Sequence, residues 1–290
     1  MEKNHNSCLI CKSSILNDLV TFKAAHLTKC KKCNFVFSKK IPSQQELIDH
    51  YDGYGRNDYL SPITIKRYNE LLDEFEKFRK NGKIIDVGCG IGYFLEEAKK
   101  RGWEVYGTEY TDEAIKICKR KGITMQQGKL NPNNYNLEEF DIITSFEVLE
   151  HINNPIEELS NFYKILRKGG LVYLTTPNFN SISRYYLKSN YNVITYPEHL
   201  SYYTPKTIKY LFKKLNFKTL KIETTGISIT RIKTSKGLSN QAFISEKSDD
   251  EILRNKIEKN FILQVFKTIV NFFLSLMGKG NSLKGWFIKI

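Results

Sequence analysis

The sequence predicts an α/β fold built on a doubly wound, mostly parallel sheet, and two observations carry this prediction. Between Lys83 and Glu223, short apolar runs that suit buried strands alternate regularly with segments of helical period. The first run leads into a glycine-rich turn, KIIDVGCGIGYF, which in such sheets lies at the ligand-binding edge. With 290 residues, of which 41% are hydrophobic, the chain can also bury a large core.

The elements follow from this alternation in chain order. Strands are expected at residues 84–87, 104–107, 124–126, 140–144, 171–175 and 217–223. Helices are expected at residues 93–100, 112–121, 156–166 and 207–215. Trp286–Ile290 is predicted to return as the last, antiparallel strand, which makes the sheet Rossmann-like and seven-stranded. Residues 226–285 then form a helical insertion, with a polar loop at 235–250, in a domain spanning residues 81–290.

Four cysteines near the N-terminus form two C-x-x-C pairs, Cys8 with Cys11 and Cys30 with Cys33. Two residues between thiolates let both sulfurs turn onto one ion, and two such pairs close a tetrahedral shell with no open position. The spacing therefore predicts a small structural zinc ribbon over residues 1–40. Four reduced thiols, or a redox pair, are the alternative interpretation.

Residues 41–80 are expected to join the ribbon to the sheet. A strand at Phe35–Phe37 ends the ribbon, and Ile41–Glu46 is a loop that leads into a capped helix. Residues 50–59 are polar, aromatic and rich in glycine, which suits a plain linker or a lid that carries tyrosines. Residues 62–80 are predicted to be helical, because apolar side chains recur there at helical spacing.

The composition indicates which partners and which cellular compartment can be expected. The formal charge of +14 would favour anionic partners, although scattered lysines produce most of it. The densest basic clusters, Lys29/Lys31/Lys32 and Lys39/Lys40, lie in the ribbon. Neither a signal peptide nor an apolar run long enough to span a membrane is visible, so a cytoplasmic location is expected. Cysteines in a reducing compartment favour metal or thiol chemistry over disulfides.

The side chains that follow the first two strands indicate the ligand. The glycines after Asp86 are spaced G-x-G-x-G, whereas a dinucleotide fingerprint requires G-x-G-x-x-G, so a nicotinamide oxidoreductase is disfavoured. The turn suits a carboxylate at the start of a helix, and Glu109 after the second strand can bind ribose hydroxyls. A ligand with both groups suggests S-adenosylmethionine.

Four motifs in order carry a family resemblance: IIDVGCGIG at 84–92, Glu109, FDIITSFEVLEH at 140–151 and LRKGGLVYLTTP at 166–177. Over about residues 80–225 the chain resembles class I S-adenosylmethionine-dependent methyltransferases, and its E-V-L-E-H string resembles the ubiquinone-biosynthesis O-methyltransferase-like branch. The resemblance implies that Asp86, Gly88 and Gly90 contact the methionyl part and that Glu109 holds the ribose. The full set of cofactor positions that it implies is Asp86, Gly88, Cys89, Gly90, Gly92, Glu109, Tyr110, Gly128, Lys129, Leu130, Ser145 and Glu147.

Within this set, Tyr110 would flank the adenine and residues 128–130 would close the adenine end, where the acidic residue common in the family is missing. The side chains of Cys89 and Cys118 are expected to pack in the core as small apolar groups.

Methyl transfer to a hydroxyl group needs a base, and His151 and His199 are the candidates. Each is alternatively a structural histidine beside the pocket. The aromatic connection at residues 178–203 is expected to cover the acceptor, either by stacking on rings or by simple packing.

In combining a four-cysteine segment with this core, the chain resembles bacterial deoxysugar and surface-polysaccharide methyltransferases. The resemblance implies a small-molecule or glycan acceptor and favours O-methylation of a sugar or glycan over C-methylation. A nucleic-acid methyltransferase that grips RNA through the basic ribbon is a rival, disfavoured because no N-P-P-Y-type motif follows the fourth strand. A non-catalytic interaction module is the other alternative.

Residues 261–277 are predicted to form an apolar helix with one polar stripe at Gln264, Lys267, Thr268, Asn271 and Ser275. Such a helix must be covered on most sides. Packing or homodimerisation is one explanation, and insertion at the inner face of the membrane is the other.

Overall fold

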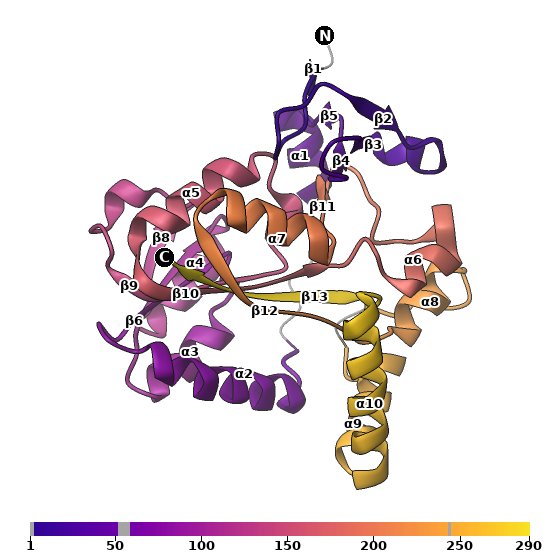
Figure 1. Ribbon diagram of the computed structural model, residues 1–290. Helices are drawn as coiled ribbons and strands as arrows, with labels where there is room; N and C mark the ends of the chain where they lie inside the picture. Colours follow the sequence, from indigo (N-terminus) through magenta and orange to yellow (C-terminus); the bar gives the residue numbers. More distant parts are fainter. Residues whose placement is uncertain (1–2, 52–58, 243–244) are drawn as a thin grey trace.

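The computed structural model describes residues 3–51, 59–242 and 245–290. Its centre is a seven-stranded sheet in the order β12-β13-β10-β9-β6-β7-β8, with helices on both faces (Figure 1). The strands are β6 (Lys83–Val87), β7 (Glu104–Glu109), β8 (Thr124–Gln127), β9 (Phe140–Phe146), β10 (Leu166–Pro177), β12 (Phe217–Thr225) and β13 (Ser282–Lys289). The predicted fold class is confirmed.

The last strand enters the sheet between two others. β13 pairs antiparallel with both β10 and β12, whereas β6, β7, β8, β9 and β10 pair in parallel. It begins at Ser282, four residues before the predicted start, because its first residues already pair with Pro177 and Thr225. The insertion between β12 and β13 is therefore residues 226–281.

Helices cover the sheet as the alternation predicts. They are α2 (Pro62–Phe75), α3 (Tyr93–Lys100), α4 (Asp112–Arg120), α5 (Pro155–Ile165) and α7 (Pro205–Lys214), with short 3-10 turns η2 (Glu76–Phe78), η3 (Pro132–Asn134) and η4 (Leu149–His151). The helix expected over 62–80 thus ends at Phe78. Its end is fixed because the Asp141 carboxylate accepts the backbone N–H groups of Lys80, Asn81 and Gly82 at 2.7–2.8 Å.

Two apolar clusters form the core around the sheet. One contains Leu174, Phe162 and Phe212, and the other contains Phe94 and Leu95, all nearly inaccessible to solvent. Residues of a strand alternate between the two faces, so the strands supply both clusters. Because β6, β7, β8, β9 and β10 run parallel, their carboxyl ends lie at one edge of this packed sheet.

The N-terminal segment supplies three of the four strands of a second, smaller sheet, of order β11-β4-β3-β2. Its strands are β2 (Leu16–Asp18), β3 (Leu27–Cys30), β4 (Val36–Ser38) and β11 (Ser201–Tyr202), with η1 (Val20–Ala25) before β3 and a separate pair β1 (Lys3–Asn4) and β5 (Lys40–Ile41). The strand predicted at 35–37 is β4, displaced by one residue. β11 belongs to the 178–203 connection, so the cysteine-rich segment and that connection share one sheet.

The remaining helices flank the connection and fill the insertion. They are α1 (Gln44–Tyr51), α6 (Ile182–Leu187), η5 (Lys188–Asn190), α8 (Ile229–Ser235), α9 (Asp249–Glu258) and α10 (Phe261–Met277). The polar loop predicted at 235–250 is reduced to the stretch between α8 and α9, of which residues 243–244 lie outside the described part. Most of the proposed 50–59 lid, residues 52–58, also lies outside it.

The α9–α10 hairpin projects away from the sheet (Figure 1). Among the described residues, no single helix has the length and apolar character needed to cross a membrane. The α9–α10 pair, bent by 116°, meets that test only when the two helices are taken together.

Candidate functional site

The glycine-rich turn after β6 needs glycine at two positions. Gly88 has φ +75°, and a Cβ there would lie 2.5 Å from Cγ2 of Val148. Gly92 has φ +77° and precedes the first turn of α3, where a Cβ would lie 2.5 Å from Ile123. Only glycine adopts these angles without strain. The turn is therefore pressed against the start of the E-V-L-E-H segment, and two motifs that are 60 positions apart meet.

Asp86, at the end of β6, is 3% exposed and accepts a hydrogen bond from the Thr144 hydroxyl at 2.8 Å. The two residues are register partners in neighbouring parallel strands. Burial raises the pKa of the Asp86 carboxyl group to about 7, the Thr144 hydrogen bond opposes this rise, and the charge of Glu109 adds to it. Thr144, which the sequence did not single out, is thus part of the site.

Glu109, at the end of β7, is tied to the glycine-rich turn. Its Oε2 accepts the Gly90 N–H at 3.0 Å, and its Oε1 accepts the N–H of Tyr110 at 2.7 Å. These bonds orient the carboxylate and leave lone pairs for ligand hydroxyls. Gly90 itself has φ +54° and open space where a Cβ would stand, so this side of the turn is accessible.

The predicted adenine positions separate into two groups. The Gly128 N–H donates to the Glu109 backbone carbonyl at 2.8 Å, which places Gly128 beside Glu109, and Tyr110 is 67% exposed. Lys129 instead forms an ion pair with Glu157 at 2.5 Å, and the Leu130 side chain is buried in the core. The structure therefore brings Gly128 and Tyr110 to the site, whereas the side chains of Lys129 and Leu130 are used in other contacts.

Cys89 and Cys118 lie beneath the same turn. The Cys118 thiol donates to the Gly90 carbonyl at 3.3 Å, and a Cβ on Gly107 would lie 2.6 Å from the Cys89 sulfur. Both thiols belong to the packed cluster under the turn, as small core residues do.

The E-V-L-E-H segment follows β9. Ser145 is buried in that strand, and Glu147 has a left-handed φ of +52° while its N–H donates to the Thr175 carbonyl at 3.0 Å. Although the Glu147 side chain reaches solvent, desolvation raises the pKa of its carboxyl group, and the charges of Arg231 and Lys284 oppose that rise. Both cations come from residues beyond 225, which links the insertion and β13 to this turn.

The two candidate bases, His151 and His199, lie next to each other. The His151 and His199 rings lie 4.8 Å apart, edge to face. The Nδ1 of His151 bonds the Glu198 carbonyl at 2.8 Å, and the Nδ1 of His199 bonds the Val193 carbonyl at 2.6 Å. A carbonyl oxygen only accepts, so each Nδ1 carries the hydrogen and each Nε2 of the neutral ring keeps a lone pair. Either ring can therefore accept a proton.

Burial lowers the pKa of both histidines. For His199 burial, and then repulsion by His151, lowers the pKa to about 4, and for His151 the direction is the same. Both rings are consequently neutral near pH 7, which is the form that acts as a base or as a metal ligand.

Glu150 is the main site residue that the sequence prediction missed. It is 2% exposed, accepts the Thr176 hydroxyl at 2.9 Å, and burial raises the pKa of its carboxyl group well above the usual value. Ligand atoms of Glu150, His151 and His199 lie within 4.8 Å of one another, close enough to share one cation. Its position next to His151 in the segment was the available signal.

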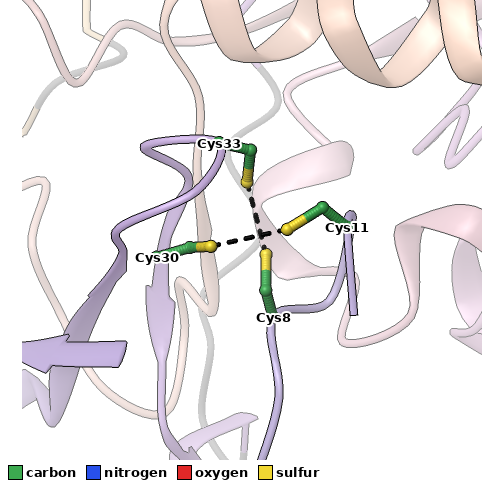
Figure 2. A group of neighbouring side chains, drawn as sticks. All are labelled: Cys8, Cys11, Cys30 and Cys33. Carbon is green, nitrogen blue, oxygen red and sulfur yellow. Dashed lines mark hydrogen bonds between the residues drawn. The ribbon is translucent and has the colours of Figure 1, made fainter. Parts of the chain in front are cut away.

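The four N-terminal cysteines converge on one point (Figure 2). The sulfurs of Cys8 and Cys33 are 3.4 Å apart, as are those of Cys11 and Cys30, and all four lie within 4.8 Å of one another. Tetrahedral zinc with bonds of about 2.3 Å would hold its sulfurs roughly 3.8 Å apart. A shell of four thiolates of this size fits a structural zinc ion.

The two cysteine turns repeat one backbone pattern. Lys12 and Asn34 each follow the second cysteine of a pair, with φ of +61° and +62°, and donate N–H to the carbonyls of Cys8 and Cys30 at 3.0 and 2.9 Å. Two equivalent knuckles of this kind are typical of a zinc ribbon. The second knuckle joins β3 to β4, and β4 pairs with β11, which begins two residues after His199.

The tyrosines of the 178–203 connection are mostly packing residues. Tyr191, Tyr202 and Tyr203 are buried, whereas Tyr185 and Tyr186 are exposed. In the basic ribbon, Lys39 and Lys40 are paired with Asp18 and Glu46 respectively. The three buried tyrosines and these two lysines are therefore engaged in contacts within the protein.

Comparison with known proteins agrees with this geometry. A family model described as a methyltransferase domain matches residues 60–222. The ubiquinone biosynthesis O-methyltransferase of Haemophilus ducreyi is 30% identical over 137 residues, which cover 42% of this chain and 57% of that protein. The chain thus spans about half the length of the curated relatives that it matches.

Solved structures share the fold. An S-adenosylmethionine-dependent methyltransferase from Archaeoglobus fulgidus is 18% identical, with a TM-score of 0.53 over 84% of this chain and 99% of that one. Phosphoethanolamine N-methyltransferase 2 of Haemonchus contortus, solved with S-adenosyl-L-methionine, is 17% identical, with a TM-score of 0.52 over 88% of this chain and 61% of that one.

Proposed function

Because the chain belongs to the methyltransferase domain family, we propose that it transfers the methyl group of S-adenosylmethionine to a hydroxyl group of a small-molecule acceptor. The observation that carries this proposal is the pair of Nδ1-anchored histidines beside Glu150. Glu150 and His151 belong to the segment that packs against the glycine-rich turn through Val148 and Gly88, and His199 reaches them from the 178–203 connection. A cofactor cradle and candidate bases thus adjoin each other.

The residues of the cradle have separable tasks. S-adenosylmethionine, when bound, supplies a methyl group on a cationic sulfur. Asp86, held by Thr144, and the turn at Gly88–Gly90 face the methionyl part, while the oriented Glu109 carboxylate accepts ribose hydroxyls. Most of the rate then comes from holding donor and acceptor in line.

The histidines supply the proton acceptor. In the proposal, the Nε2 of His151 or His199 takes the hydroxyl proton of the acceptor, while the carbonyl on Nδ1 fixes the ring orientation. O-methylation in particular is supported by the matched relatives, which are named O-methyltransferases. A sugar or glycan intermediate of surface-polysaccharide biosynthesis is the acceptor class that we propose.

Structural zinc completes the proposal. The four-thiolate shell closes the ribbon, and the ribbon holds β11, so zinc would fix the backbone that follows His199. This assigns the metal a positioning task away from the reacting atoms.

A labelled-methyl experiment tests the proposed reaction. The protein is incubated with methyl-labelled S-adenosylmethionine and pools of nucleotide sugars, glycans and lipid-linked intermediates, and products are analysed by mass spectrometry. The proposal predicts label on an oxygen of a small acceptor. Label on carbon, on nitrogen or on RNA would contradict it.

The Glu150, His151 and His199 cluster offers a second way to activate a hydroxyl, because a bound divalent cation would lower the hydroxyl pKa. The two versions differ in their response to chelation. If the histidines act as bases alone, EDTA that leaves the cysteine-bound zinc in place does not change turnover. If they hold a cation, turnover falls and is restored by added metal.

A further inference from the structure

Helix α10 docks on the protein with its polar side. Asn271 accepts the Gly226 N–H at 2.9 Å, and Ser275 accepts the Thr224 N–H at 3.3 Å. Near the other end, Gln264 donates to the Glu258 carbonyl at 2.8 Å. The polar stripe that would ordinarily face water is thus bonded to β12, to the residue after it and to α9.

The apolar side of α10 is left outside. Nine large apolar side chains of the helix are exposed, among them Phe261 at 78%, Ile262, Phe266, Phe272, Leu276 at 73% and Met277. At 100° per residue they share one arc of roughly 160°. Within the described residues nothing covers this arc, which we call the outer face of α10. Exposed apolar surface of this extent marks an interaction site.

The charges around the outer face are one-sided. Helix α10 contains no acidic residue, and Lys256 and Lys259 before it are exposed. The four acidic side chains of α9 all bond other parts of the protein: Asp249 pairs with Lys233, Asp250 caps α8, Glu251 accepts the Ser61 hydroxyl and Glu258 pairs with Lys66 and Arg67. The rim of the outer face is therefore basic.

Two exposed tyrosines beside lysines lie on α6, next to the segments that follow α10 and α8. Lys279, two residues after α10, lies 4.0 Å from the ring centre of Tyr185, and Lys236 lies 4.4 Å from that of Tyr186. Both tyrosines are exposed. Tyrosine and lysine are side chains that suit the boundary between hydrocarbon and water. An apolar groove of about 550 Å³ also opens between α9 and α10, beside Phe266 and Leu274.

We propose that the outer face of α10 docks on the surface of an anionic phospholipid membrane, with the helix lying in the plane of the interface. The apolar arc enters the boundary between headgroups and acyl chains, and Lys256, Lys259 and Lys279 face the headgroup phosphates. The polar stripe stays bonded to the protein, so the catalytic domain sits on the membrane without an inserted span.

Charge favours an anionic membrane over a second copy of the chain as the partner of the outer face of α10. Two copies that paired their outer faces would bring like-charged lysine rims together, and each copy carries a net charge of +14. An anionic bilayer complements both the arc and the rim.

Vesicle co-sedimentation tests the proposal without cofactor or acceptor, so its failure leaves the proposed reaction untouched. The full chain is mixed with phosphatidylglycerol vesicles and with phosphatidylcholine vesicles at about 0.1 M and about 0.5 M salt. The double variant Ile262→Glu/Leu276→Glu alters the outer face. Leu137→Glu is the matched control, because Leu137 is 77% exposed but belongs to the β8–β9 connection.

The wild type and Leu137→Glu are expected to bind phosphatidylglycerol vesicles, more weakly at the higher salt, and to bind phosphatidylcholine poorly. Ile262→Glu/Leu276→Glu is expected to lose roughly tenfold or more of the binding while its thermal unfolding is unchanged. Absence of wild-type binding to phosphatidylglycerol, or an equal loss in Leu137→Glu, would overturn the proposal. So would a lipid-free dimer, seen by sedimentation equilibrium, that only the double variant dissociates.

Discussion

The backbone N–H of Gly90 donates a hydrogen bond to the Glu109 carboxylate, with nitrogen and oxygen 3.0 Å apart. This bond joins the turns after two neighbouring parallel strands and fixes the direction of the carboxylate. Both groups are therefore in place before a ligand arrives, which reduces the ordering cost of binding.

Glu109→Gln should weaken S-adenosylmethionine binding by roughly ten- to a hundredfold, because a charge-assisted acceptor is replaced by a neutral group with two donors. Isothermal titration calorimetry measures the change. Glu113→Gln, an exposed carboxylate in the first turn of α4, is the matched control and should bind as the wild type does. Equal affinity in Glu109→Gln would remove Glu109 from the cofactor site.

The pH dependence of turnover should reflect the lowered histidine pKa values. A base acts in its neutral form, so activity is lost only as pH falls through the lowered pKa, about 4 for His199. With S-adenosylmethionine saturating, so that the titration of Asp86 does not limit cofactor binding, the kcat profile should therefore decline only below the ordinary histidine pKa of about 6.5, and toward pH 4 if His199 is the base. A decline centred at 6.5 or higher would show that the acting base is not one of these buried rings.

Single replacements identify which histidine acts. His151→Gln and His199→Gln each retain a polar side chain, and the variant that lacks the base should lose roughly a hundredfold or more in kcat. Its acidic limb in the pH profile should also disappear. If both variants keep turnover and profile, then neither histidine is the base.

Asp86→Asn should stabilise the ligand-free protein at high pH. The raised pKa of about 7 means that the folded chain binds more protons than the unfolded chain between about pH 4 and 7, so this group destabilises the fold as pH rises through that window. The variant should gain about 1–3 kcal/mol in unfolding free energy at pH 8 and little near pH 4. Denaturant unfolding at both pH values measures this. An equal gain at both would contradict the assigned titration.

Removal of one ribbon thiolate should release zinc and disturb the cover. Cys11→Ser should lower the metal content, measured by mass spectrometry of the purified protein, from one zinc per chain to near zero. Because β4 holds β11, the melting temperature should also fall, by more than about 5 °C. Cys118→Ser, whose thiol lies under the glycine-rich turn, should keep its zinc. Equal zinc in both variants would refute the ribbon assignment.

The predictable parts of the molecule are those with local causes. Strand and helix alternation, the C-x-x-C spacing, and carboxylates at strand ends all depend on residues close in sequence, and the structure places Asp86 and Glu109 at the glycine-rich turn as expected. The final antiparallel strand was also predictable from its apolar pattern, although pairing with Pro177 starts it earlier.

The unpredicted parts depend on tertiary contacts. Nothing local in Ser201–Tyr202 indicates that it extends the ribbon sheet, and Thr144 joins the site only because β9 lies beside β6. The place of Glu150 beside His151 was visible in the sequence, but its proximity to His199 depends on the fold. The polar stripe of α10 was visible in the sequence, but its inward direction follows from hydrogen bonds to β12 and beyond.

Separate binding measurements with two cofactors test most directly which ligand the glycine-rich turn holds. The zinc-loaded wild-type protein is titrated with S-adenosylmethionine and, separately, with NAD, and heats are measured by calorimetry. One S-adenosylmethionine is expected to bind per chain, with a dissociation constant on the order of micromolar, and NAD binding is expected to be unmeasurable. A folded protein that binds NAD, or that fails to bind S-adenosylmethionine, would contradict this expectation.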